Sequence, residues 1–192
     1  NGQVFLVNPN GILFGSSAKV NTAGFLATTK DISDDDFMKQ CYTFSGGSRD
    51  GATIINQGNL TTTRGGYIVL AADQVKNSGT ISTPEGATVL AAADTVTLQL
   101  DNGGLTTVTV NGSVVNALVD NSGLISASDG RVYLTAKGRD MLYNTVLNVS
   151  GVVNASGMSS SGGTIVLDGG DSGVVNVSGS LLADSATAKG GN

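Results

Sequence analysis

The chain has 192 residues and a net charge of −5, and only ten of its residues are Lys or Arg. This acidic balance excludes the basic surface expected of a nucleic-acid-binding protein. The chain has no His and a single Cys, which removes the usual Ser–His and Cys–His catalytic pairs, most zinc sites and any internal disulfide. With 28 Gly, 2 Pro and 13% charged residues, the composition is typical of short strands joined by tight turns rather than of disorder.

Two motifs recur along the chain. In the first, a Gly has an apolar residue four positions before it, another two positions after it and a small residue four positions after it. Its copies are centred on Gly24, Gly58, Gly79, Gly123, Gly151 and Gly179. In the second, the residue four positions after a Gly is always Leu, namely Leu6, Leu70, Leu90, Leu134 and Leu167. The positions between vary freely, so we expect strands with one inward face, and we expect Leu70, Leu90, Leu134 and Leu167 to form one stacked ladder.

The spacing of the motifs decides the architecture. Gly58 and Gly79 are 21 residues apart, and 28 residues separate Gly123 from Gly151. One coil of a three-stranded solenoid needs roughly 20 residues, so one motif per coil fits. A β-sandwich has no reason to repeat one pattern at a fixed interval. The sequence therefore predicts an all-β fold, a right-handed parallel β-helix, with residues 1–192 forming a single solenoid domain.

Asn occupies many of the expected coil corners. Its amide hydrogen-bonds neighbouring backbone groups and it tolerates left-handed backbone angles, so we expect these residues to be structural. They are Asn21, Asn56, Asn77, Asn121, Asn148 and Asn176.

The first expected turn lies at residues 8–12. Pro9 fixes one backbone angle and Gly11 permits a positive φ. The sequence therefore predicts a turn of one fixed shape, formed by Asn8, Pro9, Asn10 and Gly11 and followed by Ile12. This turn is more closely specified than the simple Gly turns elsewhere in the chain, which favours a functional role. The alternative is that it only orders the first coil.

An unusually long interval between the first two copies of the first motif predicts an insertion at about 30–48. Ser33 and Asp34 are candidate N-caps for a short helical turn within it. We expect Phe37 and Met38 to pack back on the solenoid wall.

A second interruption predicts an extrahelical β-hairpin at about 94–116. Residues 95–100 and 105–110 alternate between polar and apolar, and the intervening sequence Asp-Asn-Gly-Gly at 101–104 is a strong hairpin turn signal. The hairpin is expected to stand off the solenoid wall or to cover one of its faces.

Two acidic segments invite comparison with calcium sites. Asp34, Asp35 and Asp36 are adjacent on a turn and point in different directions, so capping and solvation explain them better. Residues 168–171 lack the repeated glycine–aspartate pattern of calcium-binding β-rolls and are expected to form a turn. We therefore expect no metal site and no cofactor.

Several segments together resemble the secretion domain of two-partner-secretion exoproteins, the filamentous haemagglutinin and high-molecular-weight adhesin group. The Asn-Pro-Asn-Gly-Ile sequence at 8–12 is similar to a signature of that family. Further similarity lies at residues 14–15, 21–25, 31–33, 44–46 and 90–94, so the resemblance covers most of the chain.

The resemblance implies a right-handed β-helix with extrahelical elements at the start of a long protein that is secreted through the periplasm to the bacterial cell surface. It implies recognition by a dedicated outer-membrane β-barrel transporter through that transporter's periplasmic repeat domains. In the family, the motif that matches Asn8, Pro9, Asn10 and Gly11 shapes a turn and is required for secretion. Family members carry a preceding signal peptide and cap, which this sequence lacks, so we expect the chain to be part of a longer protein.

The favoured function is that of a secretion-signal domain of a large exported adhesin-like protein, a binding module and not an enzyme. One alternative is a purely structural adhesin stalk. Another is a carbohydrate-acting β-helix enzyme, which the absence of His, the scarcity of Arg and the lack of clustered acids oppose. A host receptor or an extracellular polysaccharide is a candidate further partner of the full-length protein.

Overall fold

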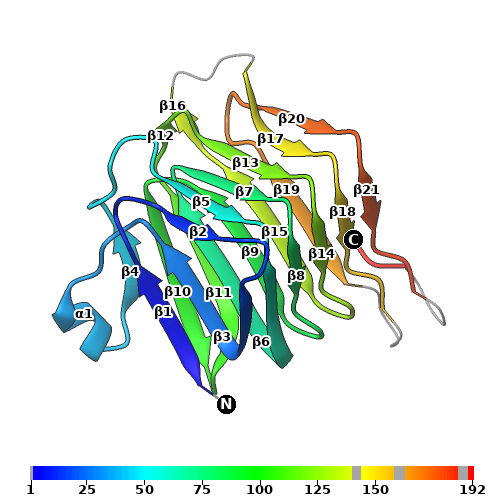
Figure 1. Ribbon diagram of the computed structural model, residues 1–192, viewed down its shortest axis with the longest axis horizontal. Coiled ribbons are helices and arrows are strands. Elements are labelled where there is room, and N and C mark those ends of the chain that lie inside the picture. Colours follow the sequence, from blue (N-terminus) through cyan, green and yellow to red (C-terminus); the bar gives the residue numbers. More distant parts are fainter. Residues whose placement is uncertain (1, 140–143, 158–162, 186–189) are drawn as a thin grey trace.

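The computed structural model describes residues 2–139, 144–157, 163–185 and 190–192. Successive turns of the chain stack side by side as a parallel β-helix (Figure 1). The predicted solenoid is therefore confirmed, and its strands lie on three faces. Within the described parts of the chain, no helix is long and apolar enough to span a bilayer.

The first face carries the Leu column. Its strands, in spatial order, are β1 (Gln3–Val7), β3 (Lys19–Thr28), β6 (Asn59–Ala72), β9 (Ala87–Ala92), β15 (Arg131–Ala136) and β19 (Thr164–Asp168). Leu70, Leu90, Leu134 and Leu167 are direct neighbours in the parallel register, and the first three are fully buried. The predicted Leu ladder is confirmed.

The second face begins with the first halves of β3 and β6, which run continuously around a corner. It continues through β8 (Thr80–Ser82), β14 (Leu124–Ser126), β18 (Val152–Asn154) and β21 (Ser180–Leu182). Its inward column is formed by Val20, Leu60, Ile81, Ile125, Val153 and Leu181.

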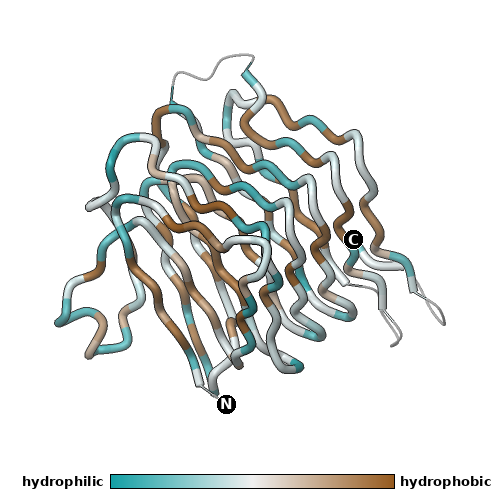
Figure 2. The backbone as a smooth tube through the Cα atoms, in the orientation of Figure 1, coloured by the Kyte–Doolittle hydropathy of each residue, from teal (hydrophilic) through white to brown (hydrophobic). Residues whose placement is uncertain are grey.

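The third face is a separate six-stranded parallel sheet. It consists of β2 (Ile12–Phe14), β5 (Thr53–Asn56), β7 (Gln74–Asn77), β13 (Leu118–Asn121), β17 (Thr145–Val149) and β20 (Val174–Val177). Its inward column is Ile12, Ile54, Val75, Val119, Leu147 and Val175. Figure 2 shows apolar segments recurring at equivalent places in successive coils, as this stacking requires.

The copy of the first motif centred on Gly24 is a wrong prediction. Gly24 pairs with Tyr67 across the register, and Leu26 pairs with Val69, so neither stacks on the Gly58 coil as expected. A Cβ at Gly24 would lie 2.5 Å from Cε1 of Tyr67, so this Gly makes room for the Tyr ring. The apolar spacing around Gly24 matched the motif by chance, because β3 runs through a corner with a bulge.

The other Gly positions of the first motif form a close-packed column. A Cβ on Gly79 would collide with the carbonyl oxygen of Gly58, and one on Gly123 would collide with that of Gly79. Gly151 and Gly179 repeat this contact in the later coils. The Gly is therefore required because the corners of adjacent coils approach too closely for any side chain.

The Asn corners form two distinct columns rather than one. Asn56 donates from Nδ2 to Oδ1 of Asn77 (2.8 Å), and Asn77 donates likewise to Asn121 (2.7 Å), all within the core. Asn148 lies one register position earlier and donates to the Asp120 carboxylate (2.7 Å) on the outer side of the sheet. The predicted corner role is confirmed for Asn56, Asn77 and Asn121, whereas Asn148 and Asn176 stack in the outer column and Asn21 is exposed within β3.

An outer sheet covers part of the first face. It contains β4 (Tyr42–Ser45), β10 (Thr95–Asp101) and β11 (Gly104–Asn111), and all its pairings are antiparallel. The predicted hairpin is thus confirmed as β10–β11, and it covers the wall instead of standing off it. A short parallel pair, β12 (Val114–Val115) with β16 (Gly138–Arg139), lies beyond it in the chain.

The outer sheet creates a second core that the repeat did not predict. Tyr67, Val69 and Val89 sit at the positions expected to vary freely on the outside, yet all three are fully buried against Leu98 and its neighbours. The prediction of a free outer face is therefore wrong for the coils that the outer sheet covers. It holds for Arg131, which is exposed.

The predicted helical insertion is confirmed as α1 (Asp34–Met38), which projects beside β4 (Figure 1). The Ser33 side chain accepts a hydrogen bond from the backbone N–H of Asp36 (3.1 Å), so Ser33 is the N-cap. Phe37 packs edge-on against Phe5, with ring centroids 5.6 Å apart. Met38 is 79% exposed, so its expected packing on the wall is wrong.

Candidate functional site

The turn at residues 8–11 joins β1 of the first face to β2 of the third face (Figure 1). Gly11 N–H donates to the carbonyl of Asn8 (3.2 Å), and the Asn10 N–H donates to the side-chain oxygen of Asn8 (3.1 Å). The second bond is an Asx turn, the local structure that Asn favours. Gly11 has φ +114°, which disfavours a side chain, and a Cβ there would lie 2.9 Å from the Thr53 carbonyl oxygen.

Two neighbouring segments hold this turn in place. From the second coil, the Thr28 carbonyl accepts a hydrogen bond from the Asn8 N–H (3.0 Å). From the end of the insertion, the Arg49 N–H donates to the Pro9 carbonyl (3.1 Å), and the Arg49 guanidinium donates to Asn10 Oδ1 (3.4 Å). The turn is therefore held by hydrogen bonds with two segments outside it, the end of β3 and the residues that follow the insertion.

The five residues singled out in the sequence divide into two groups. Asn8, Pro9 and Asn10 are exposed, and Gly11 is half-buried. Ile12 stacks on Ile54 in the inward column of the third face and packs against the main core, so its side chain supports the fold. Asn8, Pro9 and Asn10 thus form a short exposed ridge, and Ile12 anchors the chain to the core directly after it.

Sequence reasoning missed Arg49 as a partner of the turn. It lies 39 positions after Asn10, and the contact exists only because the insertion returns to the first coil. No motif marked it, since a lone Arg in a Gly- and Ser-rich stretch carries no local signal. The apolar residues beside the turn were also unmarked: Leu13 is 64% exposed and Val7 is 37% exposed.

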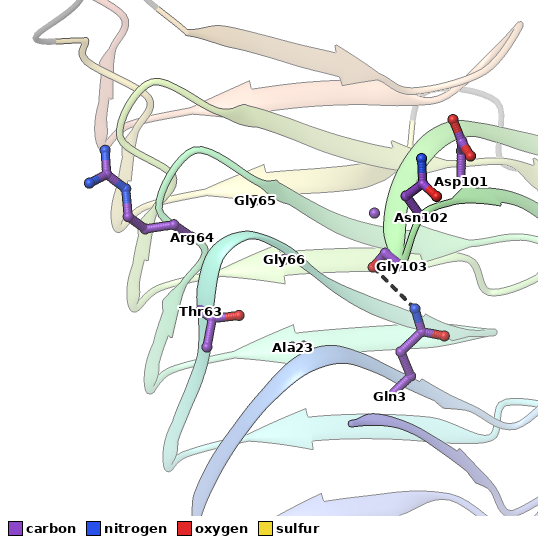
Figure 3. Close-up of a pocket in the computed structure, with 10 residues that line it drawn as sticks. Gln3, Ala23, Thr63, Arg64, Gly65, Gly66, Asp101, Asn102 and Gly103 are labelled. Atoms are coloured by element: carbon purple, nitrogen blue, oxygen red, sulfur yellow. Dashed lines mark hydrogen bonds between the residues drawn. The ribbon is translucent and has the colours of Figure 1, made fainter. Parts of the chain in front are cut away.

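A polar cavity of about 430 Å³ lies at the opposite end of β1, between the hairpin tip and a coil corner (Figure 3). Gln3 closes one side of it by donating from Nε2 to the Gly103 carbonyl (3.1 Å). Arg64 points away from the Asp101 and Asn102 side chains and is paired with Glu85 instead. The hydrogen bond from Arg64 lowers the pKa of Glu85. The Arg64 guanidinium is thus already paired with a carboxylate and is not a free cation for a ligand in this cavity.

The acidic segments have local structural roles. Asp36 lies in the first turn of α1, and its carboxylate accepts a hydrogen bond from the capping Ser33 hydroxyl (2.7 Å). Asp168 Oδ1 accepts from the Gly170 N–H (2.9 Å) in a turn. Among the described residues, no three His, Cys, Asp or Glu side chains lie together in an arrangement that could hold a metal ion.

The fold is thus a parallel β-helix with an outer antiparallel sheet and a hydrogen-bonded Asn-Pro-Asn-Gly turn at its first coil. The sequence model of one family, described as the TPS secretion domain, matches residues 1–182. The chain belongs to this family, the secretion domains of two-partner-secretion exoproteins.

Relatives and a solved structure agree with this assignment. The chain is 33% identical over 188 residues to a heme/hemopexin-binding protein of Haemophilus influenzae, a match that covers 87% of the chain and 20% of the relative. A second such protein, from H. influenzae strain Rd, is 31% identical over 197 residues, covering 89% of the chain and 19% of the relative. The crystal structure of the HMW1 secretion domain from H. influenzae superposes with a TM-score of 0.55 at 26% identity, covering 96% of this chain and 63% of that one.

The family assignment fixes the general function. The chain is a secretion domain, and proteins that carry it cross the outer membrane by way of the periplasm to the cell surface or the medium. A dedicated outer-membrane transporter is the partner that this export requires. The chain spans only about a fifth of the length of the curated relatives that it matches.

Proposed function

We propose that the turn of Asn8, Pro9, Asn10 and Gly11 is the surface that the periplasmic repeat domains of the transporter contact, and that the chain acts by binding and not by catalysis. The observation that carries this proposal is the combination of exposure and rigidity. Three consecutive side chains are exposed, while the backbone beneath them donates a hydrogen bond to the Thr28 carbonyl and accepts one from the Arg49 N–H.

Rigidity favours binding, because a surface already held in its bound shape loses little conformational freedom on association. The Asn8 and Asn10 side chains offer amide donors and acceptors at the surface. Leu13 and Val7 place exposed apolar area beside them. A partner that covers this ridge gains hydrogen bonds at its centre and apolar burial at its rim.

The test replaces Asn8 and Asn10 by Ala in the full-length protein expressed beside its transporter. The secreted amount and the melting temperature of the purified chain are then measured separately. We expect secretion to fall by about tenfold or more, the equivalent of 1.4 kcal/mol in binding, with a change of a few degrees at most in melting temperature. Equal losses in both would leave only a structural role for the turn, and normal secretion would refute the proposal.

A matched control is available at the hairpin tip. Asn102 is exposed, occupies a turn with positive φ (49°) and lies at the far end of β1 from the motif. Asn102→Ala should leave secretion unchanged. A loss of secretion with this variant would mean that the export defect does not depend on the position of the turn.

The stalk function is the competing account of the same fold. It predicts that every variant that keeps the melting temperature also keeps secretion, because a stalk contributes only length. We assign contacts with a host receptor or a polysaccharide to the regions of the exported protein outside this chain. The purified chain should then fail to compete with the full-length protein for host cells, and competition would place that contact here.

A further inference from the structure

One carboxylate joins the beginning and the end of the insertion. Asp73 lies at the corner between β6 and β7, in the coil after the insertion. Its Oδ1 accepts from Nζ of Lys30 (2.6 Å), the residue at which the insertion begins. Its Oδ2 accepts from the backbone N–H of Gly51 (2.9 Å), where the chain returns to the solenoid. Asp73 therefore closes a loop of about twenty residues.

This pair is buried. Lys30 is 2% exposed and Asp73 is 5% exposed, and the only other ion pairs among the described residues, Lys39–Asp35 and Arg64–Glu85, are at the surface. Burying two charges carries a desolvation cost that their attraction offsets only partly, so such a pair is weak evidence of a contribution to stability. We therefore examine which segment the pair holds in position.

The segment held by Asp73 also contacts the turn at residues 8–11. Arg49 lies two residues before Gly51, and its N–H and guanidinium are the groups that hold Pro9 and Asn10. Ser48 on the same segment donates to the Thr29 hydroxyl (2.5 Å), beside Lys30. Residues 48–51 thus form a short clasp with one end on the Lys30–Asp73 pair and the other on the turn.

The clasp has space into which it can move. A cavity of about 150 Å³ lies against the pair, lined in part by Ser48, Asp50 and Asp94. Arg49 and Asp50 are both exposed. No apolar core side chain lies between Ser48 and Gly51 in the sequence, so hydrogen bonds and the ion pair are what hold this segment.

We propose that Lys30 and Asp73 are positioning residues for transporter recognition: by anchoring the clasp at Gly51, the buried pair keeps Arg49 on the turn and the turn in its binding shape. This inference rests on the proposed function of the turn. It adds that recognition depends on two buried residues that no partner touches.

The first test measures whether the pair holds the clasp. Lys30→Met/Asp73→Leu removes both charges together, so neither is left buried alone. Hydrogen–deuterium exchange of the purified chain should then speed up by about tenfold or more at Arg49 and Gly51, while the amides of Leu90 and Leu134 keep their protection. Unchanged exchange at Gly51 would overturn the proposal. If Leu does not fit the corner, Lys30→Met/Asp73→Ser removes the same acceptor with a smaller side chain.

The second test measures the consequence for export. In the full-length protein beside its transporter, Lys30→Met/Asp73→Leu should lower secretion by about tenfold, as direct loss of the turn does. Lys30→Met/Asp73→Asn keeps a side-chain oxygen for the Gly51 N–H and should restore both protection and secretion. An open clasp with normal secretion would overturn the link to recognition, as would failure of the Asn variant to restore secretion once the clasp is closed.

A matched control exists in the same insertion. Lys39 and Asp35 form an exposed ion pair on α1 (3.3 Å). Lys39→Met/Asp35→Leu makes the same change of charge and should alter neither exchange at Gly51 nor secretion. The turn variant Asn8→Ala/Asn10→Ala tests the proposed function itself. Normal secretion there would refute recognition by the turn, whereas the exchange of Gly51 reports on the clasp alone.

Discussion

Single residues stabilise this protein chiefly through contact with their counterparts in the next coil. Leu134 stacks between Leu90 and Leu167, and Asn77 hydrogen-bonds both Asn56 and Asn121. Each such residue therefore has two like neighbours, one on either side. The stability of a solenoid is approximately a sum of coil and neighbour-interface terms, so one substitution inside a column weakens two interfaces.

Alternation along β15 gives a direct test at this scale. Leu134→Ala removes a fully buried side chain from the Leu column and should cost about 2–5 kcal/mol of unfolding free energy. Arg131→Ala removes an exposed side chain from the same strand. Its guanidinium donates to the Leu105 carbonyl (3.0 Å), so about 1 kcal/mol or less is expected. Urea unfolding of both variants measures the difference, and equal destabilisation would contradict the assigned faces.

Tyr67 carries a prediction about alkaline pH. Its hydroxyl has no hydrogen-bond partner among the described residues, and burial raises its pKa above the ordinary value. In the unfolded chain a Tyr ionises near pH 10, as a rough average. Because the folded protein holds this proton more tightly, its contribution to stability is present below about pH 10 and is lost as the pH rises beyond it.

The variant Tyr67→Phe should therefore melt near the wild-type temperature at neutral pH and above it at about pH 11. Thermal melts across this pH range measure the gap. Tyr133→Phe, at a half-buried position, is the control for loss of a hydroxyl. Parallel decline of the wild type and Tyr67→Phe with rising pH would show that Tyr67 is not the group responsible.

At the scale of elements, the outer sheet and the insertion act together. β4 comes from the insertion, yet it pairs with β10 of the hairpin, so two interruptions of the repeat fold as one unit. This unit covers β3, β6 and β9 and buries the second core. The segment that leaves the unit after β4 supplies the contacts from Arg49 to the turn.

Removal of the hairpin tests this arrangement. Asp94 and Gly112 lie side by side at its base, with an Asp94 N–H bond to the Gly112 carbonyl (3.5 Å), so residues 95–111 can be deleted and the ends joined. The solenoid strands should keep their far-ultraviolet circular dichroism. Exposure of Tyr67, Val69 and Val89 should make the variant bind an apolar dye that the wild type excludes. Absence of dye binding, or loss of the β signal, would contradict the two-core description.

For the whole molecule, the sequence predicted the features that are specified by repeated or local sequence patterns. The solenoid, its Leu column, the hairpin and the capped helix all follow from local patterns such as the Gly-to-Leu spacing. The second core did not follow, because whether Val69 faces solvent depends on an insertion that pairs with a hairpin about fifty residues later. The contact of Arg49 with Asn10 and the two hydrogen bonds accepted by Asp73 could not be predicted for the same reason, since they join residues far apart in the sequence. Around Gly24 the sequence predicted a copy of the motif that the structure does not contain, because the apolar spacing there matches by chance.

Binding of the transporter to the turn at residues 8–11 can be measured with purified proteins. The most direct measurement is the dissociation constant between the purified chain and the periplasmic part of its transporter, for the wild type, Asn8→Ala/Asn10→Ala and the Asn102→Ala control. We expect a dissociation constant at least about tenfold higher for the turn variant, with the control equal to the wild type. Equal constants for all three proteins, each folded by its melting curve, would contradict it.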